Sequence, residues 1–326
     1  MGDSISGRRF RILCPEPRNF SQRGIAAAGR LAQLDALNLS QSEFEKLAGS
    51  YNAFMVRLST RITSHVIAAS RDLRAIITPT TGLDHIDLEA AHAKRIELFC
   101  LRGENDFLRT VTSTAEHTWA LLLCAVRRIV PAQETVKRNR WRQDSFRSRE
   151  LSGKTLGILG LGRLGTMIAG YGLAFGMRVV AHDPYVTTCP DGVALVKRLD
   201  DLLSASDIVT IHLHLKEDTI GLIGPRELGL LPRGAYVVNT SRGLIVDEHA
   251  LLAALETGQL AGAAVDVVTN EASVFSGTHP MIQYAATHEN LLITPHIGGA
   301  SQDAIEKTDL FVMEKLERWL ETQPSR

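Results

Sequence analysis

Three segments in the second half of the chain end expected strands with polar side chains: one contains Arg242, one runs from the acid Asp266 to the acid Glu271, and one contains His296. An arginine, an acid and a histidine are the types that carry out acid–base chemistry on a small carboxylic acid. An arginine presents a two-pronged cationic fork that binds carboxylate and carbonyl oxygens. A histidine exchanges a proton near neutral pH, and an acid beside it orients the ring and stabilises the imidazolium. A lone histidine at the end of a strand is usually structural. The combination predicts a site for proton transfer on a small acid.

A glycine-rich loop precedes these residues and predicts a dinucleotide site. The motif GLGRLG (160–165) follows an apolar run and opens into a helical pattern over 166–175. Its glycines allow a tight turn, close approach of the backbone to a pyrophosphate, and close packing of helix on strand. The amide groups at the start of the helix then face the phosphates. A glycine-rich turn without a ligand is the disfavoured alternative. The residues expected to hold the cofactor are Gly160, Gly162, Arg163, Leu164 and Gly165.

Asp183 is the acidic partner expected of such a loop. It stands 183 − 165 = 18 residues after Gly165, at the end of the next expected strand. This is near the spacing of an acid that binds the ribose hydroxyls of the adenosine. A carboxylate there repels the 2′-phosphate of NADP, so the sequence predicts NAD as the cofactor.

The elements that must position these residues follow an alternating pattern. Short apolar runs predict strands at 11–14, 53–56, 75–78, 96–100, 155–159, 178–182, 208–212, 235–239, 262–267 and 291–294. Helical patterns separate most of them. This alternation predicts parallel sheets covered by helices on both faces, in which the carboxyl ends of the strands converge on the ligand.

Several helices are expected from their own signals. The stretches 24–37 and 88–94 have helical patterns. Ser113 and Glu116 have the spacing of a capping box, which predicts a helix that connects two domains and stops at Pro131. A last helix over 301–321 begins at a serine cap.

The composition excludes several classes of protein. A chain of 326 residues suggests two domains of about 150 residues each. Lys plus Arg equals Asp plus Glu at 36 each, so no net charge draws the chain to nucleic acid or to a membrane surface. The apolar runs are far shorter than the roughly 20 residues that span a bilayer. The four cysteines lack paired spacing, which favours reduced thiols and a cytoplasmic protein.

The segment 127–149 is basic and includes Trp141 and Phe146. Such a segment is either a nucleic-acid patch or a solvated arm at a subunit interface. The zero net charge favours the arm, and we expect a homodimer built through the cofactor domain and this arm. His212 and His214 have strand spacing that could suit a metal, but without a third ligand no metal site is predicted.

The sequence resembles the D-isomer-specific 2-hydroxyacid dehydrogenases, the family that includes phosphoglycerate dehydrogenase. Four segments carry the resemblance: GKTLGILGLGRLG (153–165), NTSRGLIVDEHAL (239–251), GAAVDV (262–267) and TPHIGGAS (294–301). The resemblance implies an α/β fold of two doubly wound parallel-sheet domains. A Rossmann NAD-binding domain (110–295) would be inserted into a split, flavodoxin-like substrate domain (1–109 and 296–326).

The resemblance also implies roles in the cofactor domain. Arg242 would bind the substrate, His296 would be the acid/base, and Glu271 would pair with it. The positions near the cofactor would be His212, which stands where the family often has His-x-Pro, and Thr240 and Asp266, which would lie near the nicotinamide.

In the first domain, TGLDHID (81–87) is similar to the family's substrate loop. The resemblance implies that Arg57 and the main-chain amides of Thr81, Gly82 and Leu83 bind the substrate. Phosphoglycerate-specific members carry a second arginine near position 78, where this chain has Thr78. The segment after Glu271 reads Ala-Ser-Val where the family usually has Pro.

These features together predict an NAD-dependent D-2-hydroxyacid dehydrogenase. The expected substrate is a small 2-hydroxy or 2-keto acid similar to glyoxylate or hydroxypyruvate. The alternatives are phosphoglycerate dehydrogenase and an NAD(H)-sensing corepressor that shares the fold.

Overall fold

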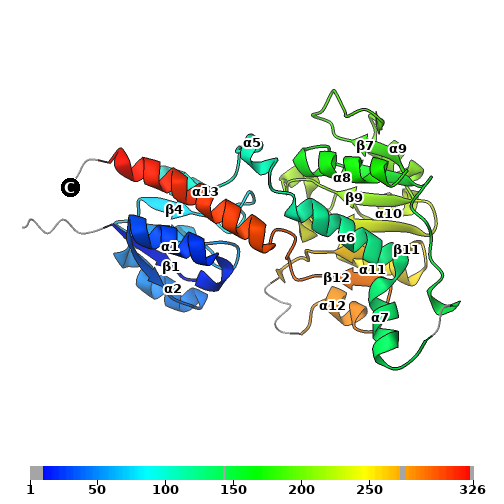
Figure 1. Cartoon of the computed structure of the whole chain (residues 1–326), viewed down its shortest axis with the longest axis horizontal. Helices are drawn as coiled ribbons and strands as arrows, with labels where there is room; N and C mark the ends of the chain where they lie inside the picture. The colour runs from blue at the N-terminus through cyan, green and yellow to red at the C-terminus, as the bar shows by residue number, and fades with distance from the viewer. Residues whose placement is uncertain (1–9, 142–143, 272–276, 324–326) are drawn as a thin grey trace, which may run out of the picture. The chain divides into compact units, whose positions relative to one another are not determined.

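A computed structural model of the chain describes residues 10–141, 144–271 and 277–323. The chain divides into two compact units, Met1–Val111 with Ala300–Arg326, and Thr112–Gly299 (Figure 1). The second unit is thus an insertion into the first. The domain boundaries expected from the sequence put residue 296 in the first domain, whereas His296 lies in the second unit. No helix within the described ranges is long and apolar enough to cross a membrane.

The first unit is a five-stranded parallel sheet between two helical layers. In sheet order its strands are β2 (Gln33–Ala36), β1 (Arg11–Cys14), β3 (Ala53–Met55), β4 (Ala75–Ile77) and β5 (Glu97–Phe99). Ile12 packs toward one face, with α1 (Gln22–Leu31) and α13 (Gln302–Glu321). Leu13 packs toward the other, with α2 (Gln41–Leu47), α3 (Ser64–Ala69) and α4 (Leu88–Ala93). The strand order 2-1-3-4-5 is flavodoxin-like, as expected.

The second unit is a seven-stranded parallel sheet with helices on both faces. In sheet order its strands are β12 (Leu291–Ile293), β11 (Leu260–Val265), β10 (Ala235–Asn239), β9 (Ile208–Ile211), β6 (Thr155–Leu159), β7 (Arg178–His182) and β8 (Val193–Leu195). Six of them follow the Rossmann order, which reverses between β6 and β9. Ligands of such sheets bind at this reversal, outside the carboxyl ends of the strands.

Two hydrophobic cores hold the helices of the second unit. One face packs against α6 (Ser113–Arg127) and α8 (Arg163–Ala174). The other packs against α9 (Leu199–Ala205), α10 (Pro225–Leu230), α11 (Glu248–Glu256) and α12 (Pro280–Ala285). The doubly wound architecture expected from the sequence is therefore confirmed in both units.

The expected helix over 24–37 is wrong in its second half. Helix α1 ends at Leu31, and residues 33–36 form the edge strand β2. The side chain of Asp35 in this strand pairs with Arg11 of the adjacent strand at 2.9 Å and accepts a hydrogen bond from Tyr51 at 2.8 Å. These tertiary contacts outweigh a helical pattern that carries no stop signal.

The helix from Ser113 also differs from expectation. Thr112, not Ser113, is the N-cap, and the hydroxyl of Ser113 donates instead to the carbonyl of Gly298 at 2.8 Å. The helix ends before Pro131, because Arg128 adopts a left-handed conformation with φ 52°. Pro131 lies in the first turn of α7 (Ile129–Lys137), where its missing N–H would have had no helical partner.

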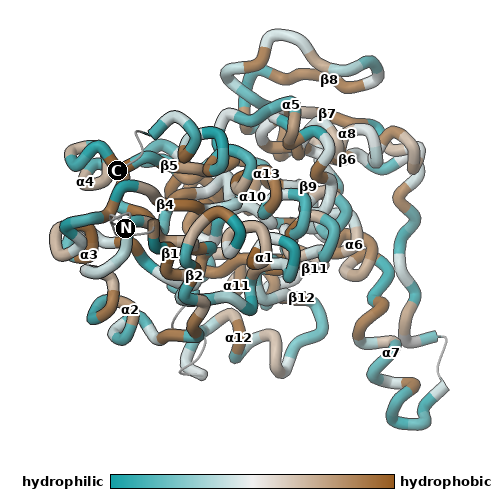
Figure 2. Tube along the Cα trace, turned by 60° about the vertical axis from the view of Figure 1, so that its left-hand side comes forward, coloured by the Kyte–Doolittle hydropathy of each residue, from teal (hydrophilic) through white to brown (hydrophobic). Residues whose placement is uncertain are grey.

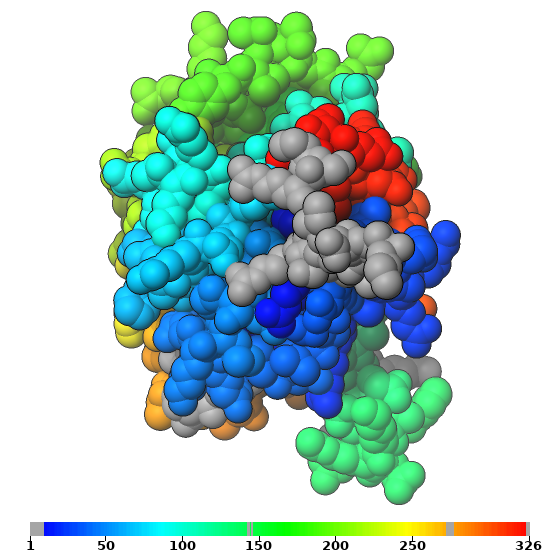
Figure 3. Space-filling view, turned by 90° about the vertical axis from the view of Figure 1, so that its left-hand side faces the viewer, coloured from blue at the N-terminus to red at the C-terminus, as the bar shows by residue number. Residues whose placement is uncertain are grey.

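Helix α7 stands away from the body of the second unit (Figure 2) and forms a separate lobe in the space-filling view (Figure 3). It exposes apolar side chains: Ile129 is 49% exposed, Val130 44% and Val136 45%. Trp141 beyond its end is 80% exposed. The arm expected over 127–149 therefore begins with an unburied apolar surface.

Candidate functional site

The glycine loop after β6 is packed so tightly that two of its glycines have no substitute. Gly160 has φ 92°, and a Cβ there would lie 2.6 Å from the carbonyl oxygen of His212. A Cβ on Gly165 would lie 2.0 Å from the carbonyl oxygen of Gly160. Gly162, at the N-cap of α8, instead borders open space. The loop thus leaves room for a ligand at the start of the helix, where amide groups attract phosphate. Arg163 and Leu164 are the first residues of that helix.

Asp183 follows β7 and closes the glycine loop. Its Oδ2 accepts the N–H of Leu161 at 2.9 Å, and its Oδ1 accepts the N–H of Tyr185 at 3.0 Å. Each carboxylate oxygen retains a further lone pair, so this half-buried acid can still accept ribose hydroxyls. Its contacts fit the role expected from the sequence.

His212 follows β9, beside the glycine loop. Both ring nitrogens are buried and find no hydrogen-bond partner among the described residues. Burial lowers the pKa of His212 to about 4, so the ring is neutral at pH 7. Two orphaned ring nitrogens beside the loop are consistent with a ligand on this side of the sheet. No group of three or more His, Cys, Asp or Glu residues in the described part of the chain could hold a metal ion.

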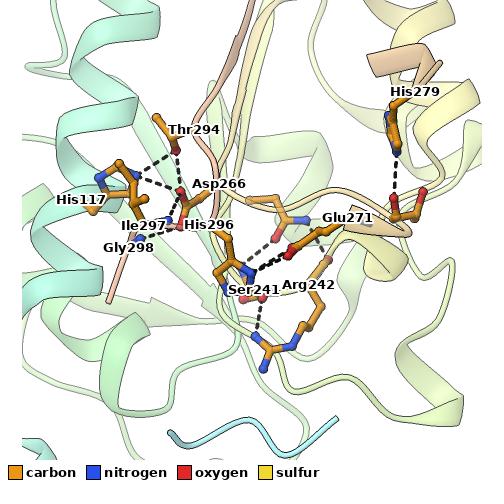
Figure 4. A network of polar contacts seen from close by, with 12 residues as sticks. His117, Ser241, Arg242, Asp266, Glu271, His279, Thr294, His296, Ile297 and Gly298 are labelled. Carbon is orange, nitrogen blue, oxygen red and sulfur yellow. Dashed lines mark hydrogen bonds and ion pairs between the residues drawn. The ribbon is translucent and has the colours of Figure 1, made fainter. Parts of the chain in front are cut away.

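Asp266 follows β11 and organises the turn that carries His296 (Figure 4). Its carboxylate is 2% exposed. Oδ1 accepts the hydroxyl of Thr294 at 2.6 Å and the N–H of Ile297 at 2.9 Å, and Oδ2 accepts the N–H of Gly298 at 2.7 Å. His117 Nε2 lies 3.2 Å from Oδ1. Asp266 thus ties β11 to the 294–298 turn and to α6.

His296 and Glu271 form the pair expected from the sequence. Nδ1 of His296 lies 2.9 Å and 3.0 Å from the two carboxylate oxygens of Glu271. A carboxylate only accepts, so Nδ1 carries a proton and Nε2 is the atom left for proton exchange. The backbone of His296 is left-handed, with φ 54°. Its N–H donates to the carbonyls of Asp266 at 2.9 Å and Thr294 at 3.0 Å, which holds this conformation.

Arg242 extends from the end of β10, beside the His296–Glu271 pair in Figure 4. Its Nη1 donates to the carbonyl of Ser241 at 2.8 Å. Its own carbonyl accepts from the side chain of Asn239 at 2.9 Å. The neighbouring Thr240 is buried, and its hydroxyl lies 2.7 Å from that of Thr118 on α6.

Sequence reasoning missed the contribution of α6. His117 and Thr118 lie on the inner face of this helix, where Nε2 of His117 is also 3.0 Å from the Thr294 hydroxyl. The signal was a polar stripe, Thr114, His117 and Thr118 at helical spacing, on a helix that is otherwise apolar. The sequence pattern predicts this helix only as a connector between domains.

The predicted substrate residues of the first unit lie after β3 and β4. Arg57 Nη2 pairs with Asp309 Oδ1 of α13 at 2.7 Å, and the Asp309 side chain is fully buried. Glu16 is also buried, and its carboxylate accepts the backbone N–H of Arg57 at 2.9 Å and the backbone N–H of Thr60 at 3.2 Å. The arginine is thus already paired within its own unit.

The loop after β4 contains the other three. Leu83 is buried, Thr81 and Gly82 are half-buried, and the carbonyl of Gly82 accepts the hydroxyl of Thr80 at 2.8 Å. Thr78, at the position where a second arginine was sought, is fully buried.

Comparison with known proteins identifies the family. Residues 119–298 match the model of the D-isomer specific 2-hydroxyacid dehydrogenase, NAD binding domain. The chain belongs to this family. The match confirms the resemblance drawn from the sequence, the Rossmann cofactor domain and NAD as its ligand.

Among curated proteins, two D-3-phosphoglycerate dehydrogenases are similar to this chain. That of Archaeoglobus fulgidus is 36% identical over 291 residues, which are 88% of this chain and 53% of the relative. That of Rattus norvegicus is 36% identical over 297 residues, 90% of this chain and 53% of the relative. The chain therefore spans about half the length of the curated relatives it matches.

Two solved structures extend the likeness over both units. A Thermus thermophilus protein has a TM-score of 0.85 and 31% identity, covering 96% of this chain and 98% of its own. The D-lactate dehydrogenase of Aquifex aeolicus, solved with NAD and lactic acid, has a TM-score of 0.83 and 27% identity, covering 95% of each chain. Both therefore share the complete two-unit fold.

Proposed function

We propose that this protein is an NAD-dependent oxidoreductase that transfers a hydride between the nicotinamide and a small D-2-hydroxy acid or its 2-keto acid. The observation that carries the proposal is the 2.9 Å pair of His296 and Glu271, at the carboxyl edge of a Rossmann sheet. Arg242 lies at the same edge of the sheet, after β10, which is adjacent to β11. Membership of the family supports this assignment.

The chemistry assigned to the side chains follows from their contacts. NAD, when bound, supplies the hydride acceptor. In oxidation, Nε2 of His296 takes the hydroxyl proton, and Glu271 stabilises the imidazolium that results. In reduction, the protonated ring donates to the oxygen of the keto acid. Arg242 binds the carboxylate and carbonyl oxygens with its fork of N–H groups. The main-chain amides of 81–83 are proposed to hold the substrate carboxylate.

The proposed substrate is a small unphosphorylated acid similar to glyoxylate or hydroxypyruvate. Arg57 supports this choice, because its charge is already paired with the buried Asp309. A dianionic phosphate needs fixed cations that are not otherwise neutralised. Phosphoglycerate dehydrogenase is the second candidate, which the names of the curated relatives favour.

An NADH oxidation assay with a panel of 2-keto acids tests the proposal. We expect turnover of glyoxylate or hydroxypyruvate, with 3-phosphohydroxypyruvate well behind. The variant His296→Asn serves as the control and should show no turnover. NADH binding without turnover of any acid would favour the NAD-sensing corepressor instead. Faster turnover of 3-phosphohydroxypyruvate than of both small acids would favour the phosphoglycerate enzyme.

We also propose a homodimer formed through the second unit and the α7 arm. Helix α7 leaves Ile129, Val130 and Val136 exposed, although large apolar surfaces of monomers are normally covered. Leu123, Arg127, Ala132 and Gln133 line a shallow groove together with Ile129 and Val136. A second copy of the arm region is the occupant we propose.

A further inference from the structure

Glu248, which lies outside the proposed catalytic residues, holds the segment that leads to Glu271. It is the first residue of α11, and its side chain is 13% exposed. Its Oε1 accepts the N–H of Thr269 at 2.6 Å, and its Oε2 accepts the hydroxyl of the same residue at 2.7 Å. Both oxygens of this carboxylate therefore bind Thr269.

The carbonyl of Thr269 is bound by His279, at the N-cap of α12. Nε2 of His279, a residue labelled in Figure 4, lies 2.8 Å from this carbonyl. The same nitrogen lies 3.6 Å from Oε2 of Glu248. A carbonyl only accepts, so Nε2 carries a proton. The ring is 4% exposed. The backbone N–H of Thr269 is thus bound by the largely buried Glu248, and its carbonyl by the buried His279.

The backbone of Val268 and Thr269 packs directly against Gly243, the residue that follows Arg242. A Cβ on Gly243 would lie 2.2 Å from the carbonyl carbon of Val268 and 2.4 Å from the nitrogen of Thr269. The backbone at 268–269 therefore has no room to shift toward Gly243. It is fixed by hydrogen bonds at both polar groups and by packing against the loop that carries Arg242.

We infer that Glu248 is a positioning residue, which sets the carboxylate of Glu271 against the ring of His296 by holding Thr269. Only Asn270 separates Thr269 from Glu271. Asn270 is left-handed, with φ 46°, a conformation that asparagine tolerates better than most residues. The left-handed backbone of Asn270 therefore determines where Glu271 lies relative to the anchored Thr269.

A purely structural role for Glu248 makes a different prediction. An acid at the start of a helix stabilises the helix through its dipole. If Glu248 acted only in this way, its loss would lower the Tm without changing how the ring of His296 titrates. The titration of His296 therefore separates the two roles.

The test measures the titration of the His296 imidazole by NMR in the NADH complex of the full chain. The resonance is assigned by its loss in His296→Asn. Among the described residues, Glu271 is the ionisable side chain that contacts the ring. Figure 4 also draws Arg242 and Asp266 beside the turn that carries His296, and His117 contacts Asp266. None of them is altered by the variant Glu248→Gln, whose amide nitrogen cannot accept from Thr269.

We expect Glu248→Gln to move the titration midpoint to lower pH, because a displaced Glu271 stabilises the imidazolium less. In a Glu271→Gln background the same substitution should have no further effect. Glu256→Gln, at the exposed far end of the same helix, is the matched control and should leave the midpoint unchanged. Should Glu248→Gln not fold, Thr269→Val removes only the hydroxyl contact and should shift the midpoint in the same direction.

Two results would overturn the inference. An unchanged midpoint in Glu248→Gln or, if that variant does not fold, in Thr269→Val would reduce Glu248 to a structural residue. A shift of equal size in the Glu271→Gln background would mean that Glu248 acts on His296 directly through space. The inference rests on the proposed function for the role of the pair, but the titration needs no turnover. If no keto acid is turned over but Glu248→Gln still shifts the titration of His296 through Glu271, the proposed function is refuted and the inference stands.

Discussion

His296 is constrained at its backbone and at its ring by two different acids. The main chain and carboxylate of Asp266 hold the turn around it, and Glu271 binds Nδ1. This division matters for mutagenesis, because removing Asp266 should distort the loop, whereas changing Glu271 should alter mainly the charge next to the ring.

Glu271→Gln keeps an acceptor for the ring but removes the charge that stabilises the imidazolium. Keto-acid reduction needs a protonated His296, so the alkaline limb of its kcat/KM profile should move to lower pH. The acid limb of hydroxy-acid oxidation, which needs a neutral ring, should move the same way. Coincident profiles of wild type and variant, measured in both directions, would contradict the pairing.

Asp183→Ala should relax the preference for NAD over NADP. The substitution removes the repulsion of the 2′-phosphate of NADP. It also removes the hydrogen bonds to the ribose, which should weaken the binding of NAD by about 1–3 kcal/mol. The measurement is the ratio of kcat/KM for the two cofactors. Because Asp183 also closes the glycine loop through Leu161, Asp183→Asn, which retains one acceptor, is the control for loop distortion. An unchanged ratio in both variants would mean that Asp183 does not bind the ribose.

His212 should make the protein without cofactor less stable in acid. Its folded-state pKa of about 4 lies below the value of 6.5 for an unperturbed histidine. The unfolded chain therefore binds more protons between these values, and the free energy of unfolding falls as the pH drops from about 6.5 to about 4. The full contribution is roughly 3 kcal/mol. Urea unfolding of His212→Asn should show a flatter dependence over this range, and an unchanged slope would contradict the assignment.

At the scale of elements, burial decided what the sequence could predict. The strands β6, β7 and β10 have the expected bounds, because long apolar runs identify central strands well. The sequence predicts helix where the edge strand β2 lies and no strand at β8, because both strands are short and only partly buried.

The sequence singles out the candidate residues of the site, whereas the contacts that support them could not be predicted from it. Arg242, Glu271 and His296 each follow an expected strand and have types that suit one reaction. The contacts that hold the site join residues far apart in the chain, such as His117 and Thr294, which are 177 residues apart. No local pattern encodes such a contact.

Helix α13 and the loop after β3 meet at the buried pair of Asp309 and Arg57. Gly24 of α1 makes room for this acid, because a Cβ there would lie 2.6 Å from Cβ of Asp309. Burial raises the pKa of Asp309, while Arg57 and Ser21 act in the opposite direction. We expect Asp309→Asn to release the charge of Arg57 and to improve phosphorylated over unphosphorylated acids.

The ratio of kcat/KM for 3-phosphohydroxypyruvate to that for glyoxylate should rise about tenfold in Asp309→Asn, which corresponds to about 1.4 kcal/mol. Asp303→Asn, an exposed position of the same helix, provides the control. If both substrates lose activity equally, Asp309 supports only the fold of the first unit.

At the scale of the whole molecule, the exposed face of α7 bears on assembly. Val136→Glu should place a charge in the proposed interface and convert the homodimer to a monomer of 35.7 kDa. Light scattering after size exclusion gives the mass directly. Ile220→Glu, a substitution at an exposed apolar side chain outside the arm, should leave the mass unchanged. A wild-type protein that is already monomeric would refute the proposed dimer.

The hydrogen bond from Ser113 to the carbonyl of Gly298 also has a consequence for folding. It joins the two ends of the inserted unit, whose limits are Thr112 and Gly299. The entropy lost on closing a loop grows with the length of the flexible chain that joins its ends. Once the insertion has folded, its two ends lie close together. It then acts as a short loop between the two segments of the first unit, which brings these segments together. The nested order of the chain thus favours folding from the inside outward.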